Sequence, residues 1–245
     1  MAKGNFDTRL PEDRHGEVGE LMRAFNHMAE DLAKTSYLQK DFISSISHEF
    51  KTPIASIKGY ARLLQMEGLP PEEQREYINT IANQADRLAR LSQTLLRLSS
   101  LEQQTAPASV TEFRLDEQLR EVIVGLAPAW EDRNIDWDLS LEPVTLASDQ
   151  ELLRQVWINL IQNAVKFSDA NTTIAIKVTN EKEATVSVTD HGIGMDEETQ
   201  KLIFNRFFQG EKSRSNEGVG LGLSLCKRIV DILHGKITVT SVNPE

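Results

Sequence analysis

Most of the first hundred residues carry an apolar stripe at helical spacing, and this stripe breaks once. From Glu17 to about Gln65 apolar side chains recur three or four positions apart, which predicts one long helix. Gly68-Leu69-Pro70-Pro71 ends that run, because a proline does not extend the helix before it. A second stripe follows, again at steps of three and four: Ile78, Ile81, Ala85, Leu88, Leu91, Leu95 and Leu98. The sequence therefore predicts an antiparallel helical hairpin.

The apolar stripe of the second helix predicts a partner. Two helices alone leave the part from Leu88 to Leu98 facing water, and such a patch is too large to stay exposed. Pairing two hairpins into a four-helix bundle would bury it. We therefore expect a homodimer.

Beyond Thr105–Ser109, a small and proline-containing boundary, the pattern changes to mixed helices and strands. Helices are expected near 115–127, 149–167 and 222–233, and strands near 135–141, 173–179, 185–189 and 236–241. These elements predict an α/β sandwich with helices against one mixed sheet, so the fold class of the whole chain is α+β.

Composition excludes some functions. Apolar residues at 40% and charged residues at 26% are typical of globular proteins. The formal net charge of −10 argues against nucleic-acid binding, which needs a concentrated basic face. The single cysteine, Cys226, is typical of a reducing compartment. No apolar run approaches the roughly 20 residues that span a bilayer.

His48 lies in Ser47-His48-Glu49-Phe50-Lys51-Thr52-Pro53, within the first helix. An exposed imidazole is a good nucleophile near neutral pH. Glu49 could hold the proton of one ring nitrogen and direct attack through the other, and the Thr52 hydroxyl, one turn away, could orient a water. A surface histidine without chemistry is the ordinary alternative. A zinc pair is disfavoured because no second histidine follows at the required spacing.

Asn159 and Asn163 lie four residues apart in a largely apolar helix, so their side-chain oxygens project from one face. Amide oxygens suit Mg²⁺, which takes further ligands from water and substrate phosphates. Lys166, on a neighbouring face, could reach a phosphate. The alternative is a polar stripe that merely faces solvent.

Asp190-His191-Gly192-Ile193-Gly194 follows a predicted strand. The carboxylate at the strand end could accept a hydrogen bond from an exocyclic amine such as adenine N6. The two glycines would let the backbone approach a flat ring closely. An ordinary strand-to-helix turn would look similar.

Gly218-Val219-Gly220-Leu221-Gly222 opens the last helix, and backbone N–H groups at a helix start favour phosphates. A polar stretch, 209–217, precedes these glycines and is typical of a lid that closes over a nucleotide. A Rossmann dinucleotide site would have a hydrophobic strand at that place. Phe204-Asn205-Arg206-Phe207-Phe208 could anchor one end of this lid, and core packing is the alternative role for these phenylalanines.

The order of these motifs, from about Tyr37 to the C-terminus, resembles the sensor histidine kinase family, which calls them the H, N, G1, F and G2 boxes. The resemblance implies a dimerisation and histidine phosphotransfer hairpin over 35–103. It also implies a catalytic ATP-binding domain of the GHKL type over 108–245. The linker at 102–109 would let that domain swing to the hairpin.

By this resemblance His48 is the phospho-acceptor, Glu49 is its acid–base partner, and Thr52 positions water when the protein dephosphorylates its partner. Asn159 and Asn163 would bind Mg²⁺, Lys166 would contact the phosphates of ATP, and Asp190 would read adenine. The remaining pocket residues would be Gly192, Gly194, Phe208, Gly218, Gly220, Leu221 and Gly222. The implied partner is a response regulator, whose receiver-domain aspartate takes the phosphoryl group.

Residues 4–34 resemble the second half of a HAMP signal-transmission module, which gives a first segment at 1–34. In the family this module joins a membrane helix to the hairpin. We therefore expect a parent protein in the bacterial cell membrane, with this part facing the cytoplasm. The family also follows the strand 236–241 with a further strand, which we expect to be missing because the chain ends at Glu245.

Two other classes fit parts of the pattern. A gyrase- or chaperone-like ATPase has a similar nucleotide fold, but its magnesium helix carries a glutamate as hydrolytic base where Asn159 stands. A non-enzymatic dimeric scaffold would have a degenerate nucleotide pocket, whereas Asp190, Asn163 and the glycines are intact. ATP hydrolysis without a phosphoprotein would favour the first class, and a lack of MgATP affinity would favour the second.

Overall fold

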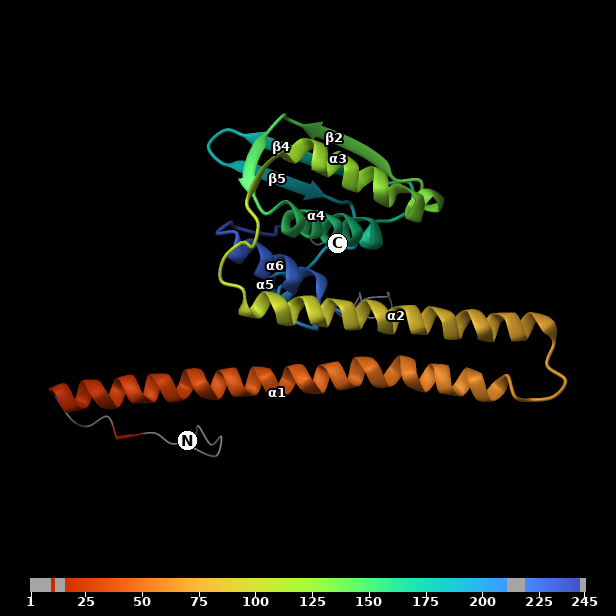
Figure 1. Cartoon of the computed structure of the whole chain (residues 1–245), viewed down its shortest axis with the longest axis horizontal. Helices are drawn as coiled ribbons and strands as arrows, with labels where there is room; N and C mark the ends of the chain where they lie inside the picture. Colours follow the sequence, from red (N-terminus) through yellow and green to blue (C-terminus); the bar gives the residue numbers. More distant parts are fainter. Residues whose placement is uncertain (1–9, 12–15, 211–218, 243–245) are drawn as a thin grey trace. The chain divides into compact units, whose positions relative to one another are not determined.

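The computed structural model describes residues 10–11, 16–210 and 219–242 of the chain (Figure 1). They belong to two compact units, Met1–Leu88 and Ala89–Glu245, whose boundary falls inside a helix. Within the described ranges, no helix combines the length and the apolar character that crossing a lipid bilayer requires.

Two long helices make up most of the first unit. Helix α1 spans Glu17–Leu63 and α2 spans Pro71–Gln103, so the predicted hairpin is confirmed. Gly68, at φ 81°, supplies the left-handed residue of the turn between them. Pro71 begins α2, where its missing N–H costs no helical hydrogen bond.

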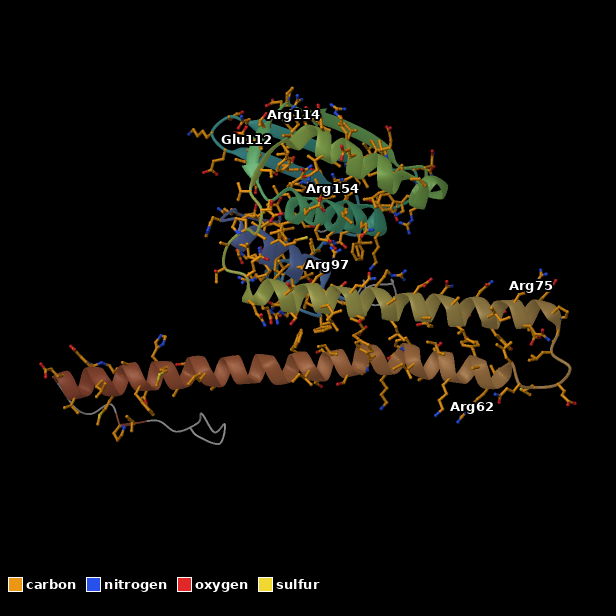
Figure 2. The ribbon with its side chains drawn as sticks, viewed as in Figure 1. Arg62, Arg75, Arg97, Glu112, Arg114 and Arg154 are labelled. Carbon is orange, nitrogen blue, oxygen red and sulfur yellow. The ribbon has the colours of Figure 1, made fainter. Side chains whose placement is uncertain are left out.

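Within this unit α1 and the first part of α2 contact each other directly. The rings of Tyr60 and Tyr77 lie 5.3 Å apart between centroids. The side chains of Arg62 and Arg75 point away from the opposite helix (Figure 2). Several large apolar side chains of the hairpin remain exposed: Ile43, Ile54, Leu63, Met66 and Ile78. A single hairpin therefore leaves large apolar side chains facing water.

The C-terminal turns of α2 belong to the second unit. Leu91 and Leu98 are each only 2% exposed in the single chain, so this half of the apolar stripe does not by itself require a second copy, contrary to our expectation. Polar contacts within the second unit also hold this part of α2. Arg97 donates to Gln155 on the helix Gln150–Phe167 (α4), and Arg228 donates to the Leu101, Glu102 and Gln104 carbonyls at 3.0, 3.2 and 2.7 Å.

The described residues of the second unit form two small sheets. Strand β1 (Thr111–Arg114) pairs antiparallel with β3 (Thr145–Ser148). In the other sheet, β4 (Thr173–Asn180) lies between β2 (Asp136–Leu141), to which it is parallel, and β5 (Ala184–Thr189), to which it is antiparallel. The strands expected near 135–141, 173–179 and 185–189 are confirmed. The four-residue strands β1 and β3 were not predicted.

Four α-helices complete the described part of this unit. They are α3 (Leu115–Leu126), α4, α5 (Glu197–Leu202) and α6 (Gly222–Ile232), and a 3₁₀ segment, Ala127–Arg133, follows α3. The path from β2 to the parallel strand β4 runs through α4, as parallel pairing requires a crossover. The predicted α+β class, a helical hairpin followed by an α/β domain, is confirmed.

The core of the second unit lies on one face of β4. Ile174, Ile176 and Val178 alternate along the strand and are fully buried. Helices α3, α4 and α6 gather on this side of the sheet, and α4 contacts both α3 and α6 (Figure 1). This packing fixes α4, which carries Asn159, Asn163 and Lys166, and the start of α6, which carries Gly222.

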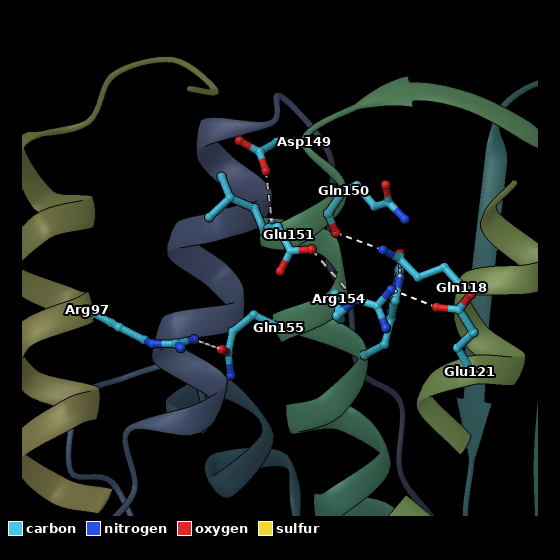
Figure 3. Close-up of polar contacts among 10 residues, drawn as sticks. Arg97, Gln118, Glu121, Asp149, Gln150, Glu151, Arg154 and Gln155 are labelled. Atoms are coloured by element: carbon cyan, nitrogen blue, oxygen red, sulfur yellow. Dashed lines mark hydrogen bonds and ion pairs between the residues drawn. The ribbon is translucent and has the colours of Figure 1, made fainter. Parts of the chain in front are cut away.

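A buried polar network joins α3 to α4 (Figure 3). The Gln118 amide donates to the Gln150 carbonyl at 2.7 Å and accepts from Trp157 Nε1 at 3.0 Å. Beside it, Arg154 pairs with Glu121 at 2.8 Å. Because these buried polar atoms are satisfied, the network fixes the register of α4 against α3.

The prediction of a strand at 236–241 is wrong. Burial alternates along this segment, with Ile237, Val239 and Ser241 half-buried, yet the described residues form no ladder with β5. Side-chain contacts hold its end instead, because Met195 N–H donates to Ser241 Oγ at 2.9 Å and the Gln200 amide donates to the Ser241 carbonyl at 3.1 Å. The alternation was real, but a strand also needs backbone pairing.

Candidate functional site

His48 lies on α1 with an exposed side chain, as the sequence suggested. The Thr52 hydroxyl, one turn further on, donates to the His48 carbonyl at 3.4 Å. Pro53 is buried within the helix and has no N–H, so the carbonyl one turn earlier, on Glu49, loses its usual helical donor. Because the His48 side chain is exposed, a reactant can approach its imidazole ring from solvent.

Glu49 is oriented differently from His48. Its side chain is half-buried, and Oε2 lies 3.2 Å from Nη2 of Arg87 on α2. Neighbouring residues on a helix do not face each other, so a carboxylate turned toward α2 is turned away from the imidazole. The sequence pattern did not reveal Arg87, because no local motif links it to Glu49.

Asn159 on α4 presents its amide oxygen to the start of α6. Its Nδ2 donates to the Gln155 carbonyl at 2.9 Å, which leaves Oδ1 on the opposite side of the amide. A Cβ on Gly222 would lie 3.0 Å from that oxygen. Asn163 follows one turn later and is half-buried, and Lys166 Nζ lies 4.7 Å from the centroid of the Phe167 ring.

The loop after β5 is fixed to the C-terminal end of α4. Asp190 Oδ1 accepts from the Gly192 N–H at 3.0 Å, and the Asp190 side chain is exposed. The Ile193 N–H donates to the Phe167 carbonyl at 3.3 Å, and His191 Nδ1 lies 2.9 Å from the Thr173 carbonyl oxygen. Gly194, at φ 63°, takes the left-handed conformation that glycine adopts without strain.

The phenylalanine segment meets the glycine turn. The Phe207 N–H donates to the Gly220 carbonyl at 2.9 Å. A Cβ on Gly220, which has φ 70°, would lie 2.6 Å from the Phe208 carbonyl oxygen. Leu221 is 2% exposed and directly precedes α6. Gly218 lies outside the described residues, as does most of the predicted lid.

One residue that supports this site was not predicted. Arg133 Nη1 donates to the Val165 and Ser168 carbonyls at 2.8 and 3.2 Å and so caps the C-terminal end of α4. The two partners are far from Arg133 in sequence and form no motif with it, so only the fold reveals the contact. Asn159, Gly220, Gly222 and the Asp190 loop thus lie on segments that the second unit holds together.

Family comparisons agree with this arrangement. The HAMP domain matches residues 1–34, and the His Kinase A (phospho-acceptor) domain matches 38–104. The Histidine kinase-, DNA gyrase B-, and HSP90-like ATPase family matches 148–245. Fold and motifs thus define a phospho-acceptor hairpin joined to an ATPase-like domain.

Among curated proteins, the signal transduction histidine-protein kinase ArlS of Staphylococcus aureus (strain USA300) is 30% identical over 98% of this chain and 54% of its own length. This chain belongs to the histidine kinase family. It spans about half the length of the curated relatives it matches.

Two solved structures share this architecture. The complex of histidine kinase ThkA with response regulator protein TrrA is 29% identical, with a TM-score of 0.67 over 82% of this chain and 57% of that chain. Full-length ShkA in complex with AMPPNP is 26% identical, with a TM-score of 0.56 over 79% of this chain and 41% of that chain.

Proposed function

We propose that this chain is the cytoplasmic core of a membrane-anchored sensor histidine kinase. It uses MgATP to phosphorylate His48 and passes the phosphoryl group to an aspartate of a response regulator. One observation carries the proposal: Asn159 lies against Gly222 in the second unit, and the same chain presents an exposed His48 in a phospho-acceptor family match.

The residues of the second unit fit a magnesium nucleotide. The amide oxygen of Asn159 is aimed at the glycine turn by its Nδ2 hydrogen bond, and hard oxygen donors are what Mg²⁺ prefers. Asn159 and Asn163 would hold the ion, which neutralises phosphate charge when bound. Asp190 uses Oδ1 on Gly192, so Oδ2 is the oxygen that would accept from the adenine amine.

The transfer itself needs positioning more than strong acid–base help. A nitrogen of the neutral His48 ring attacks the γ-phosphorus, the new N–P bond forms, and the bond to the β–γ bridging oxygen breaks to release ADP. Lys166 would balance charge on the phosphates. The ring becomes cationic as the bond forms, and Glu49 would stabilise the remaining N–H or take its proton.

Partners follow from the same proposal. The exposed apolar residues of the hairpin support a homodimer, and the ThkA–TrrA complex supports a receiver-domain partner. The ShkA complex with AMPPNP, an ATP analogue, supports adenine nucleotide binding. Thr52, with its hydroxyl one turn from His48, is the residue that would orient water for dephosphorylation of the partner.

Incubation with radiolabelled ATP tests this function. We expect a phosphoprotein that is labile to acid and stable to base, and we expect His48→Gln to abolish labelling while nucleotide binding persists. His234→Asn is the matched control, because it removes another exposed histidine at a left-handed position that asparagine tolerates. Undiminished labelling of His48→Gln, or hydrolysis of ATP without a phosphoprotein, would contradict the proposal.

A further inference from the structure

An ion pair joins Arg87 on α2 to Glu49, the residue that follows His48 on α1. We propose that Arg87 is a positioning residue that holds the Glu49 carboxylate away from His48 while the hairpin rests. This inference rests on the proposed function, in which Glu49 serves the His48 ring during phosphoryl transfer.

The contact joins the two helices of the first unit. Arg87 Nη2 lies 3.2 Å from Glu49 Oε2, and the two side chains are 29% and 21% exposed. Such partly buried charges are screened less than fully exposed ones. The Arg87 guanidinium therefore competes with the His48 ring for the Glu49 carboxylate.

Helix geometry makes the two partners of Glu49 compete. Successive side chains on a helix diverge by about 100°, since a turn contains 3.6 residues. His48 is exposed, whereas Glu49 is turned inward onto α2. To reach the ring N–H that becomes acidic as the N–P bond forms, the carboxylate has to leave Arg87. The resting ion pair thus opposes the reaction.

The size of the effect follows from the strength of the pair. Partly exposed ion pairs contribute about 0.2–1 kcal/mol, which corresponds to at most about a fivefold change in the fraction of released carboxylate. We expect Arg87→Met, in the full 245-residue chain, to raise the maximal rate of His48 labelling about two- to fivefold. The KM for ATP should not change, because the pair is remote from the nucleotide motifs in sequence and belongs to the hairpin unit.

Three further variants make the test specific. Arg87→Lys keeps the charge and should label at close to the parent rate. Arg75→Met removes an arginine that points away from α1 on the same helix, and should have no effect (Figure 2). In a Glu49→Gln background, Arg87→Met should no longer raise the rate, because no carboxylate remains to be released.

A lower maximal rate in Arg87→Met, or an equal increase with and without Glu49, would overturn the inference. Circular dichroism checks that the hairpin stays folded. If Arg87→Met unfolds it, Arg87→Gln provides the same comparison without charge. An unmodified chain that fails to label with ATP would refute the proposed function itself, a separate outcome.

Discussion

Gly192 lies against the carbonyl of Phe167: a Cβ on Gly192 would be 2.4 Å from that oxygen. No real Cβ contact is so short, and the atom it meets is backbone, which cannot rotate away. The loop that carries Asp190 can therefore approach the end of α4 this closely only because residue 192 is a glycine.

Gly192→Ala should therefore displace the Asp190 loop and weaken nucleotide binding. A cost on the order of 1–3 kcal/mol corresponds to about 5- to 150-fold in Kd. Isothermal titration with ADP measures it. Gly125→Ala is the matched control, because a Cβ on Gly125 meets nothing within 4 Å and Gly125 lies within α3. That change should leave Kd unaltered and stabilise the helix by about 0.5–1 kcal/mol.

Asn159→Ala should reduce the contribution of Mg²⁺ to nucleotide binding and labelling. The Asn159 side-chain oxygen faces Gly222, so the substitution removes an oxygen ligand for Mg²⁺ that lies beside the start of α6. We expect a reduction in labelling rate of roughly 10- to 100-fold at fixed Mg²⁺. Binding of ADP in EDTA should change little. Gln162→Ala, which removes an exposed amide from the same helix, is the control, and equal losses in both variants would contradict the assignment.

Asp116 should make the stability of the second unit depend on acid pH. The hydrogen bond from Arg114 lowers the pKa of Asp116 below its ordinary value, and the Val144 N–H also donates to this carboxylate. A lowered folded pKa gives stability that is complete above the unfolded pKa and is lost as pH falls through the folded pKa.

Asp116→Asn should cost about 1–3 kcal/mol of unfolding free energy near neutral pH, because a buried charged acceptor is replaced. Urea unfolding followed by fluorescence should also show a smaller loss of stability between pH 5 and pH 3 than in the parent. Asp138→Asn, at an exposed position of β2, should leave the profile unchanged.

Cys226 should be inert toward alkylation in the folded chain. Burial in α6 raises the pKa of its thiol to about 12, so almost no thiolate exists at pH 8. Mass spectrometry after iodoacetamide treatment should find it unmodified in buffer and modified in urea. Rapid modification in buffer would show that the second unit opens readily.

Long periodic elements could be predicted from the sequence, and short paired ones could not. The stripes of α1, α2 and α4 extend over many turns and give a strong helical signal. Strands β1 and β3 have four residues each and exist because they pair with each other, which no local pattern reports. At 236–241 the reverse holds, since alternation is present without pairing.

The same distinction applies to the candidate site. Motifs singled out candidate residues by their chemistry, such as His48, Asn159 and Asp190, and their roles stay predictions. They did not identify the arginines that organise them, because Arg87 and Arg133 act through contacts between separate elements. Arginine is common on helix surfaces, so its position gains meaning only when the fold places a carboxylate or free carbonyls within reach.

The contact of Arg228 with the last carbonyls of α2 ties the end of that helix to α6. Helix α6 begins at Gly222, beside Asn159, and about two turns later its Arg228 donates to the Leu101 and Glu102 carbonyls at the end of α2. A displacement of α2 must break these bonds, and any effect of nucleotide binding on this contact has an equal reciprocal effect on nucleotide affinity. The end of α2 can therefore separate from α6 only at the free-energy cost of these hydrogen bonds.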